Sequence, residues 1–147
     1  MMQNVIEDLR RAVDDAAAQF AQLNEADASA PLAAGKWSRK QLLGHLIDSA
    51  ANNHQRFIRA QLDGPNAFPG YEQEAWVERN GYADAAWSDL VALWQAYNLH
   101  LLRVIARIPP DHLDVACTVG GSEPMTLGFI AEDYVRHLKH HLQQMFP

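Results

Sequence analysis

Apolar residues recur every three or four positions along much of this chain, which is the spacing of one face of an α-helix. The first such stretch covers residues 2–23, where the charged residues lie largely on the opposite side of the helix. Its apolar face consists of Val5, Leu9, Val13, Ala16, Phe20 and Leu23. This pattern predicts an amphipathic helix, which packs its apolar face against other elements of the fold.

Capping signals and helix breakers mark two further helices. Ser38, followed three residues later by Gln41, predicts a capping box at the start of the second helix, which should run to about Leu62 and stop at Asp63-Gly64-Pro65. The third helix should end before Pro109-Pro110. Its apolar stripe consists of Leu90, Leu93, Trp94, Tyr97, Leu101, Val104 and Ile108.

The connections and remaining caps follow from turn-forming residues. Residues 64–86 are rich in Gly, Pro, Asn and aromatics and should form a structured crossover with a short helix around residues 71–79. Ser88 or Asp84 is expected to cap the third helix. The segment "LDVACTVGGSEPMTL" should make a small hairpin before Thr126 caps the last helix.

These elements predict an all-α fold, a four-helix bundle with crossover connections. The chain has 147 residues, of which 48% are apolar, enough to bury one core of ordinary size. No internal repeat, low-complexity tract or linker divides it. We therefore expect a single domain over residues 1–147.

Charge and composition exclude several classes of partner. The net charge is −6 and the basic residues are scattered, so no surface for nucleic acid is expected. Acidic residues interrupt the N-terminal segment, which is unlike a signal peptide, and the lone Cys117 cannot form an intramolecular disulfide. No apolar run approaches the roughly 20 residues of a membrane span. The sequence thus predicts a soluble, cytoplasmic protein.

The sequence "HLKHH" at positions 137–141 places three histidines on little more than one turn of the last helix. His137 and His141 lie about 40° apart on the helix, and His140 lies about 60° from His137 on the other side. Periodicity alone leaves both pairings open, although four-residue spacing suits a chelate better. Taken alone, such a pair is more typical of a solvated helix end. A catalytic zinc-type site usually takes three protein ligands.

The candidate third ligand is His45, on the second helix. Ser49, Asn52 and Arg56 each fall within about 40° of His45 around the helix and form with it a polar stripe beside apolar residues. His45 alone could be a hydrogen-bonded core residue, but a buried stripe of this kind needs partners, and a metal with its surrounding hydrogen bonds would supply several. The other candidates are weaker: His54 should face solvent, His100 lie at a boundary, His112 lie in a loop and Cys117 fill an apolar gap.

Two motifs resemble those of the DinB superfamily, and especially of its YfiT-like branch. "KWSRKQLLGHLIDSAANNHQRF" is similar to the second-helix signature that contains the first metal ligand, and "DYVRHLKHHLQQM" is similar to the closing motif. The resemblance implies that His45, His137 and His141 are the three ligands and that His140 is a neighbour. It also implies a bundle of down-up-up-down type, a divalent metal ion (zinc or nickel, with iron, manganese and copper as alternatives), and a homodimer.

The family resemblance implies an activity as well. Members include S-transferases that use a low-molecular-weight thiol and a thiol-dependent maleylpyruvate isomerase, and the YfiT-like branch is described as metal-dependent hydrolases. The first hypothesis is therefore an enzyme in which the metal activates a thiol cosubstrate for attack on a small electrophile. In it Asn52 or Arg56 orients the substrate, and Tyr71, Glu74 and Trp76 either wall the pocket or pin a loop.

Two alternatives remain open at this point. One is a hydrolase with a metal-bound hydroxide, for which Glu74 or Glu132 would be the general base. The other is a metal-binding stress-response module without turnover. Asp48 is either a hydrogen-bond acceptor behind the ligands or a solvated residue on the helix surface.

Overall fold

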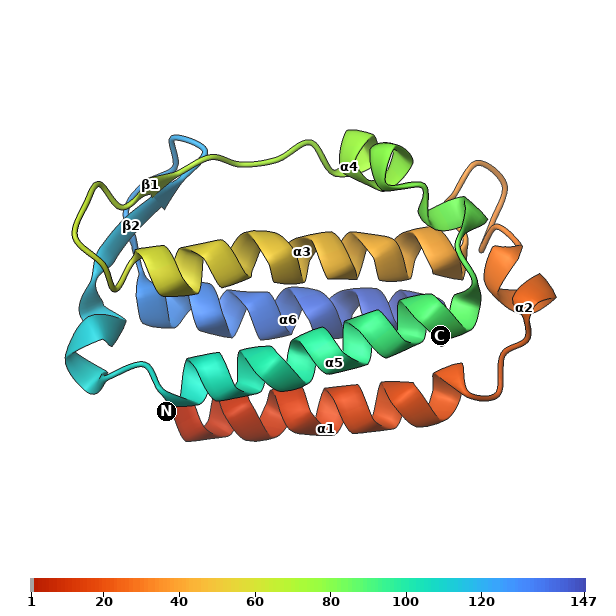
Figure 1. The fold of residues 1–147 in the computed structure, drawn as a ribbon, viewed down its shortest axis with the longest axis horizontal. Helices are drawn as coiled ribbons and strands as arrows, with labels where there is room; N and C mark the ends of the chain where they lie inside the picture. The colour runs from red at the N-terminus through yellow and green to blue at the C-terminus, as the bar shows by residue number, and fades with distance from the viewer. Residues whose placement is uncertain (1) are drawn as a thin grey trace.

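The computed structural model describes residues 2–147. Its four long helices are α1 (Met2–Phe20), α3 (Arg39–Arg59), α5 (Trp87–Ala106) and α6 (Leu127–Met145). Helix α3 contacts α5 and α6, and α1 also contacts α5 and α6. Figure 1 shows that α3 and α5 run in one direction, and α1 and α6 in the other. The predicted all-α four-helix bundle with crossovers is confirmed.

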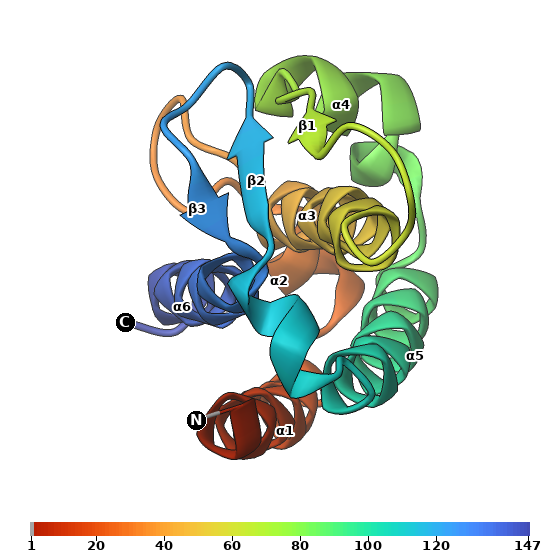
Figure 2. The same ribbon diagram turned by 90° about the vertical axis from the view of Figure 1, so that its left-hand side faces the viewer.

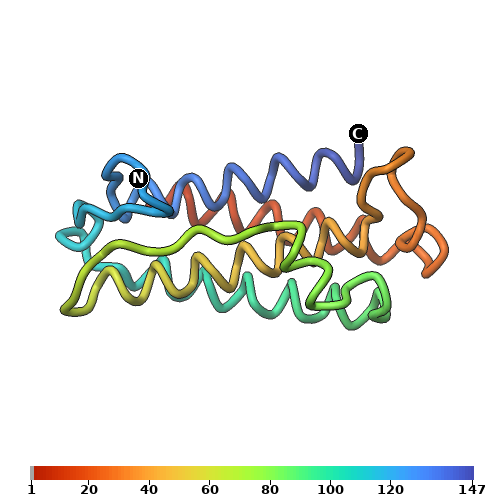
Figure 3. The backbone as a smooth tube through the Cα atoms, turned by 90° about the horizontal axis from the view of Figure 1, so that it is seen from above, coloured from red at the N-terminus to blue at the C-terminus, as the bar shows by residue number. Residues whose placement is uncertain are grey.

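The parallel arrangement of α3 and α5 requires the chain to travel back along the bundle between them. Residues 60–86 do so, passing along α3 (Figures 1 and 3). This crossover contains β1 (Ala67–Phe68), α4 (Gln73–Asn80) and the 3-10 helix η1 (Tyr82–Asp84). The short helix predicted at 71–79 is thus α4. It ends at Gly81, whose φ of 69° is the left-handed conformation that favours glycine at this position.

The end of the crossover is docked on α3 through Tyr82. The Tyr82 ring lies directly against Gly44, where any Cβ atom would overlap it. The Tyr82 hydroxyl donates to Asp48 Oδ1 at 2.6 Å, and Asn80 Nδ2 donates to the same oxygen at 3.0 Å. Asp48 is therefore buried rather than solvated, and its side-chain partners come from the crossover and not from a histidine.

A small sheet ties the crossover to the segment before α6 (Figure 2). Strands β2 (Ala116–Val119) and β3 (Met125–Thr126) form the predicted antiparallel hairpin. Within its loop, Gly120 and Gly121 both have positive φ, as the central residues of a type I′ turn do, and Ser122 N donates to Val119 O across them at 3.1 Å. The parallel pairing of β1 with β2 was not predicted, because two-residue strands carry no periodic signal. The predicted cap of α6 is confirmed, since Thr126 Oγ1 accepts from Phe129 N at 3.0 Å.

The starts of α3 and α5 are capped differently. Ser38 and Gln41 form the predicted capping box. The prediction for α5 was wrong: neither Ser88 nor Asp84 caps it, and Glu25 Oε1 instead accepts from Trp87 N at 2.6 Å. Glu25 begins α2 (Glu25–Ser29), a short helix that was not predicted, and its other oxygen pairs with buried Lys40 at 2.6 Å. This cap comes from a residue that is distant in sequence.

The hydrophobic core lies between the four long helices, all of which contribute to it. Phe20 packs edge-to-face against Trp87 and Trp94, with ring centroids 5.2 and 5.4 Å apart. The free end of α6 is held by Arg39, which donates to the carbonyl oxygen of Met145 from Nε and a terminal nitrogen at 3.2 and 2.9 Å. Within residues 2–147, no helix is long and apolar enough to cross a membrane. The 3-10 helix η2 (Pro110–Asp114) follows α5.

Candidate metal centre

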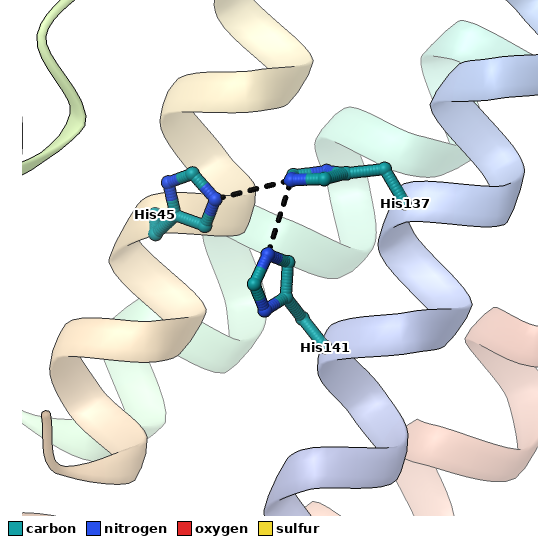
Figure 4. A group of neighbouring side chains, drawn as sticks. All are labelled: His45, His137 and His141. Carbon is teal, nitrogen blue, oxygen red and sulfur yellow. Dashed lines mark hydrogen bonds between the residues drawn. The ribbon is translucent and has the colours of Figure 1, made fainter. Parts of the chain in front are cut away.

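Three histidines from two helices converge between α3 and α6. His45 lies on α3 and is fully buried, while His137 and His141 project from adjacent turns of α6 (Figure 4). His137 Nε2 lies 3.2 Å from Nε2 of His45 and 3.0 Å from Nε2 of His141. The candidate ligand atoms of the three all lie within 4.8 Å of one another. The structure thus brings together the three residues that the sequence analysis selected.

This arrangement of donors fits a divalent metal ion. Each neutral imidazole has one lone pair, and three nitrogens that face one another cannot all be satisfied by N–H donors from within the group. Zinc bonds of about 2.0–2.1 Å in tetrahedral geometry place ligand nitrogens about 3.3 Å apart. The spacings of 3.2 Å (His45 to His137) and 3.0 Å (His137 to His141) are close to this value. The three-histidine cluster and the chemistry of imidazole therefore indicate a divalent metal. That His45, His137 and His141 each bind the ion stays a prediction, which metal analysis of the protein would test.

Burial keeps the cluster in the form that binds metals. Loss of hydration, together with the neighbouring His141 and His137, lowers the pKa of His45 to about 4. Burial also lowers the pKa of His137 to about 4, together with His141, although Asp133 opposes this shift. The pKa of His141 is lowered by burial as well. All three imidazoles are consequently neutral at pH 7, with no proton for a metal to displace from the charged form.

Two further side chains hold the cluster, and sequence reasoning missed both. Gln144 Oε1 accepts from His141 Nδ1 at 2.7 Å, which leaves the Nε2 lone pair of His141 directed at His137. The Trp37 ring packs against the His45 ring with centroids 5.4 Å apart. Gln144 lies three residues after His141, on the same side of the helix, so its position was a usable signal. Trp37 could not be placed beside His45 without the tertiary fold.

The structure separates His140 from the convergent pair. His140 is exposed, and its ring centroid lies 5.2 Å from that of His141 on the outer side of α6. It lines a groove between α1 and α6 with Asp8, Lys139 and Glu132. His137 and His141 are therefore the pair that meets His45, which periodicity alone left open. Glu132 lies in the same groove and not among the three histidines.

A cavity of about 540 Å³ is lined by two side chains that contact the cluster. Trp37, which covers His45, and Gln144, which holds His141, both line it. Glu74 also lines this cavity, as the sequence analysis expected of a pocket wall. The remaining lining residues are Leu32, Gly35, Lys36, Leu42 and Gln73. The cluster thus has a small-molecule-sized space beside it.

The two predicted catalytic residues lie farther along α3. Asn52 and Arg56 are about 10 and 16 Å beyond His45 at the rise of an α-helix. Asn52 Nδ2 donates to the backbone oxygen of Asp48 at 2.9 Å, and Arg56 donates to the carbonyl oxygen of Pro69 at 3.4 Å. Arg56 therefore contacts the crossover, and proximity does not support a role for either residue at the histidines. That role stays a prediction.

Asn52 and the aromatic residues of the crossover form a region separate from the histidine cluster. Tyr71 and Trp76 pack together with ring centroids 5.3 Å apart and line a second cavity with Asn52. They do not line the cavity that Trp37 and Gln144 line. Of the three residues expected to wall the pocket, Glu74 alone does so, because α4 lies between the two cavities and directs its residues to both.

His54, His100 and His112 contact residues outside the three-histidine cluster. The prediction that His54 faces solvent was wrong, because α5 packs beside that face of α3: His54 Nδ1 lies 2.9 Å from the Tyr97 hydroxyl, and its ring lies 5.3 Å from that of exposed His100. His112 contacts Gln61 Oε1 from Nδ1 at 3.0 Å. Cys117 is buried, as expected of a residue that fills an apolar gap.

Comparison with known proteins identifies the family. The model of the DinB superfamily matches residues 6–145, and the chain belongs to this superfamily. A curated protein of Oceanobacillus iheyensis named "Putative metal-dependent hydrolase OB0413" is 35% identical over 55 residues, a match that covers 37% of this chain and 32% of that protein. The matched region thus spans about a third of the length of this curated relative.

Two solved structures share the fold. YfiT from Bacillus subtilis, titled "a probable metal-dependent hydrolase with an unusual four-helix bundle topology", superposes with a TM-score of 0.85 at 21% identity, over 98% of this chain and 83% of that one. The mycothiol-dependent maleylpyruvate isomerase superposes with a TM-score of 0.78 at 12% identity, over 99% of this chain and 61% of that one. At these identities the likeness concerns the fold.

Proposed function

We propose that this chain is a metal-dependent enzyme whose three-histidine centre serves a thiol-dependent transfer to a small electrophile. The observation that carries the proposal is the convergence of three neutral imidazoles beside a cavity of about 540 Å³. Zinc or nickel is the proposed ion. A divalent ion held by His45, His137 and His141 would act as a Lewis acid that lowers the pKa of a thiol or of water at its open position.

The residues of the chain prepare the site for this chemistry. Neutral ligands add no negative charge, so the positive charge available to stabilise a thiolate is not reduced. Gln144 orients His141 through its hydrogen bond. Trp37, Leu32 and Leu42 give the cavity an apolar wall that excludes water from a bound substrate. The fold that this chain shares with the mycothiol-dependent maleylpyruvate isomerase also supports a thiol cosubstrate.

Hydrolysis is the second candidate function, and the position of Glu74 in the cavity wall favours it. Its carboxylate lines the cavity that Trp37 and Gln144 also line, and there it would take a proton from water. The hydrolase names given to the Oceanobacillus iheyensis protein and to YfiT agree with this alternative. Glu132, the other base considered, is placed in the groove between α1 and α6.

The first experiment is metal analysis of the purified protein with single-site variants. We expect about one divalent ion per chain in the wild type, and loss of that ion in His45→Ala, His137→Ala and His141→Ala. His140→Ala is the matched control because it removes a neighbouring imidazole outside the cluster, and it should retain the metal. Unchanged metal content in His45→Ala would show that the ligand assignment is wrong.

The second experiment separates the reactions. The metal-loaded protein is assayed with a panel of low-molecular-weight thiols and chlorodinitrobenzene, and in parallel with nitrophenyl esters without thiol. Turnover that needs both thiol and metal supports transfer, whereas ester cleavage that is lost in Glu74→Gln supports hydrolysis. Metal binding without turnover in either assay would reject both and leave a metal-binding module.

A further inference from the structure

Two opposite charges line the cavity that Trp37 and Gln144 also line, and within residues 2–147 neither charge forms an ion pair. Lys36 lies in the loop before α3, and Glu74 lies in the first turn of α4; both line the cavity. Within residues 2–147, the ion pairs join other residues: Lys40 to Glu25, Arg136 to Asp133, and Lys139 to Asp8. Lys36 and Glu74 are thus free to interact with a ligand.

The groove between α1 and α6 provides a contrast. It is similar in size, about 510 Å³, and is also lined by charged residues. There, however, Lys139 Nζ lies 2.7 Å from Asp8 Oδ2, so its charges already meet across the groove. Lys139 of that groove is therefore already paired, whereas Lys36 and Glu74, which are both exposed, form no ion pair within residues 2–147 in the cavity lined by Trp37 and Gln144.

An apolar wall accompanies the two charges. Leu32, Leu42 and the half-buried Trp37 line the same cavity, and the Trp37 ring continues to the ring of His45 at 5.4 Å. A ligand whose apolar body packs on this wall would lie next to the histidine cluster. The volume of about 540 Å³ is in the usual range for small-molecule sites.

We propose that this cavity binds a zwitterionic small molecule of the amino-acid type, with its carboxylate at Lys36, its ammonium group at Glu74 and its apolar part against Trp37. A ligand with a carboxylate alone would be repelled by Glu74, and one with an amine alone by Lys36, so carrying both groups is favoured. The inference deepens the proposed function, since it names the chemical class that would carry the reacting thiol or electrophile.

Three matched probes test the charge requirement: L-phenylalanine, 3-phenylpropionate and 2-phenylethylamine. Their affinities are measured by NMR titration of the full-length, metal-loaded protein, with the Trp37 indole signal assigned through Trp37→Phe. We expect L-phenylalanine to bind about three- to tenfold more tightly than either singly charged probe, the effect of one charge-assisted contact at an accessible site. The Trp37 signal should shift.

Two variants then assign the charges. Lys36→Met should lower the affinity for L-phenylalanine about three- to tenfold and leave the affinity for 2-phenylethylamine equal or higher. Glu74→Gln should also lower the affinity for L-phenylalanine about three- to tenfold, but it should leave the affinity for 3-phenylpropionate equal or higher. Glu78→Gln, one turn further along α4, and Lys139→Met in the α1–α6 groove are the matched controls and should bind all probes as the wild type does.

Equal affinity for the three probes, or wild-type affinity for L-phenylalanine in both cavity variants, would overturn the inference. The titrations are repeated on metal-free protein, where a probe cannot gain affinity by ligating the ion. Preference for the zwitterion there, together with no turnover in the thiol and ester assays, would refute the proposed enzyme and keep the binding site. Turnover without a preference for the zwitterion would support the proposed enzyme and refute the proposed binding site.

Discussion

Gln144 is the residue through which α6 orients one of its own histidines. Its Oε1 accepts the Nδ1 proton of His141, so it sets which nitrogen of that ring is free to bind a metal. A glutamine three residues after the second histidine is therefore part of the site, although it does not face the centre of the cluster. The consequence can be measured as metal affinity.

Gln144→Leu is expected to weaken metal affinity about tenfold to 100-fold, the usual effect of removing a hydrogen bond behind a metal ligand. The dissociation constant is measured by competition with a chelating dye. Gln143→Leu is the control, because Gln143 is exposed on the neighbouring position and has no hydrogen bond to the three histidines within residues 2–147. Equal affinity in the two variants would contradict this role for Gln144.

The lowered histidine pKa values predict how the metal-free protein responds to acid. His45 and His137 have pKa values of about 4 in the folded state against an ordinary value of 6.5, so the unfolded chain binds more protons between these values. The free energy of unfolding therefore falls as the pH decreases from about 6.5 to 4. Urea unfolding of metal-free protein at several pH values measures the slope.

The control for this prediction is the double variant His45→Gln/His137→Gln. Other groups titrate in the same interval, so the informative quantity is the difference in slope between the wild type and this variant. The variant should lose less stability than the wild type over the same pH range. A wild-type slope in the variant would show that the cluster is not the source of the acid sensitivity.

At the scale of elements, the crossover is positioned by a close contact between η1 and α3. Tyr82 occupies the space where a side chain at position 44 would lie, and its hydroxyl satisfies buried Asp48. A glycine inside a helix ordinarily costs about 0.5–1 kcal/mol relative to alanine. Here the absence of a side chain at position 44 allows the Tyr82 ring to dock the crossover on the helix that carries His45.

Gly44→Ala is expected to destabilise the protein by about 1–3 kcal/mol, because the added methyl group overlaps the Tyr82 ring. Chemical denaturation measures the change in the free energy of unfolding. In a Tyr82→Ala background the same substitution should be neutral or stabilising by up to about 1 kcal/mol, since the overlap is gone and helix propensity improves. Equal effects in both backgrounds would rule out the contact as the cause.

At the scale of the whole molecule, the histidine cluster joins two antiparallel helices, α3 and α6. A metal bound by His45 on one side and by His137 and His141 on the other would crosslink the bundle in its folded state alone. Binding to the folded chain stabilises it by about 2.7 kcal/mol when the free metal concentration is 100 times the dissociation constant.

Adding zinc or nickel to the metal-free protein should therefore raise the midpoint of thermal unfolding, and chelation should reverse the effect. His45→Ala should abolish the response because it removes the donor on α3, whereas His140→Ala should respond as the wild type does. Differential scanning calorimetry measures both. A metal-dependent shift that persists in His45→Ala would place the ion elsewhere on the chain.

The elements that could be predicted from the sequence are those whose causes lie within a few residues. The capping box of Ser38 and Gln41, the Thr126 cap, the hairpin at Gly120-Gly121 and the four long amphipathic helices all depend on spacings of one to four positions. The same local geometry identified His137 and His141 as a possible chelate. Short elements such as α2 and β1 lack enough residues for such a signal.

The remaining features depend on contacts between residues that are far apart in sequence. The choice of His141 over His140 depends on which side of α6 faces His45, and the cap of α5 depends on Glu25, which lies 62 residues before Trp87. Arg56 contacts the crossover at Pro69 because that segment runs along α3 (Figure 1). Periodicity tells which residues share a helix face, but packing decides what that face meets.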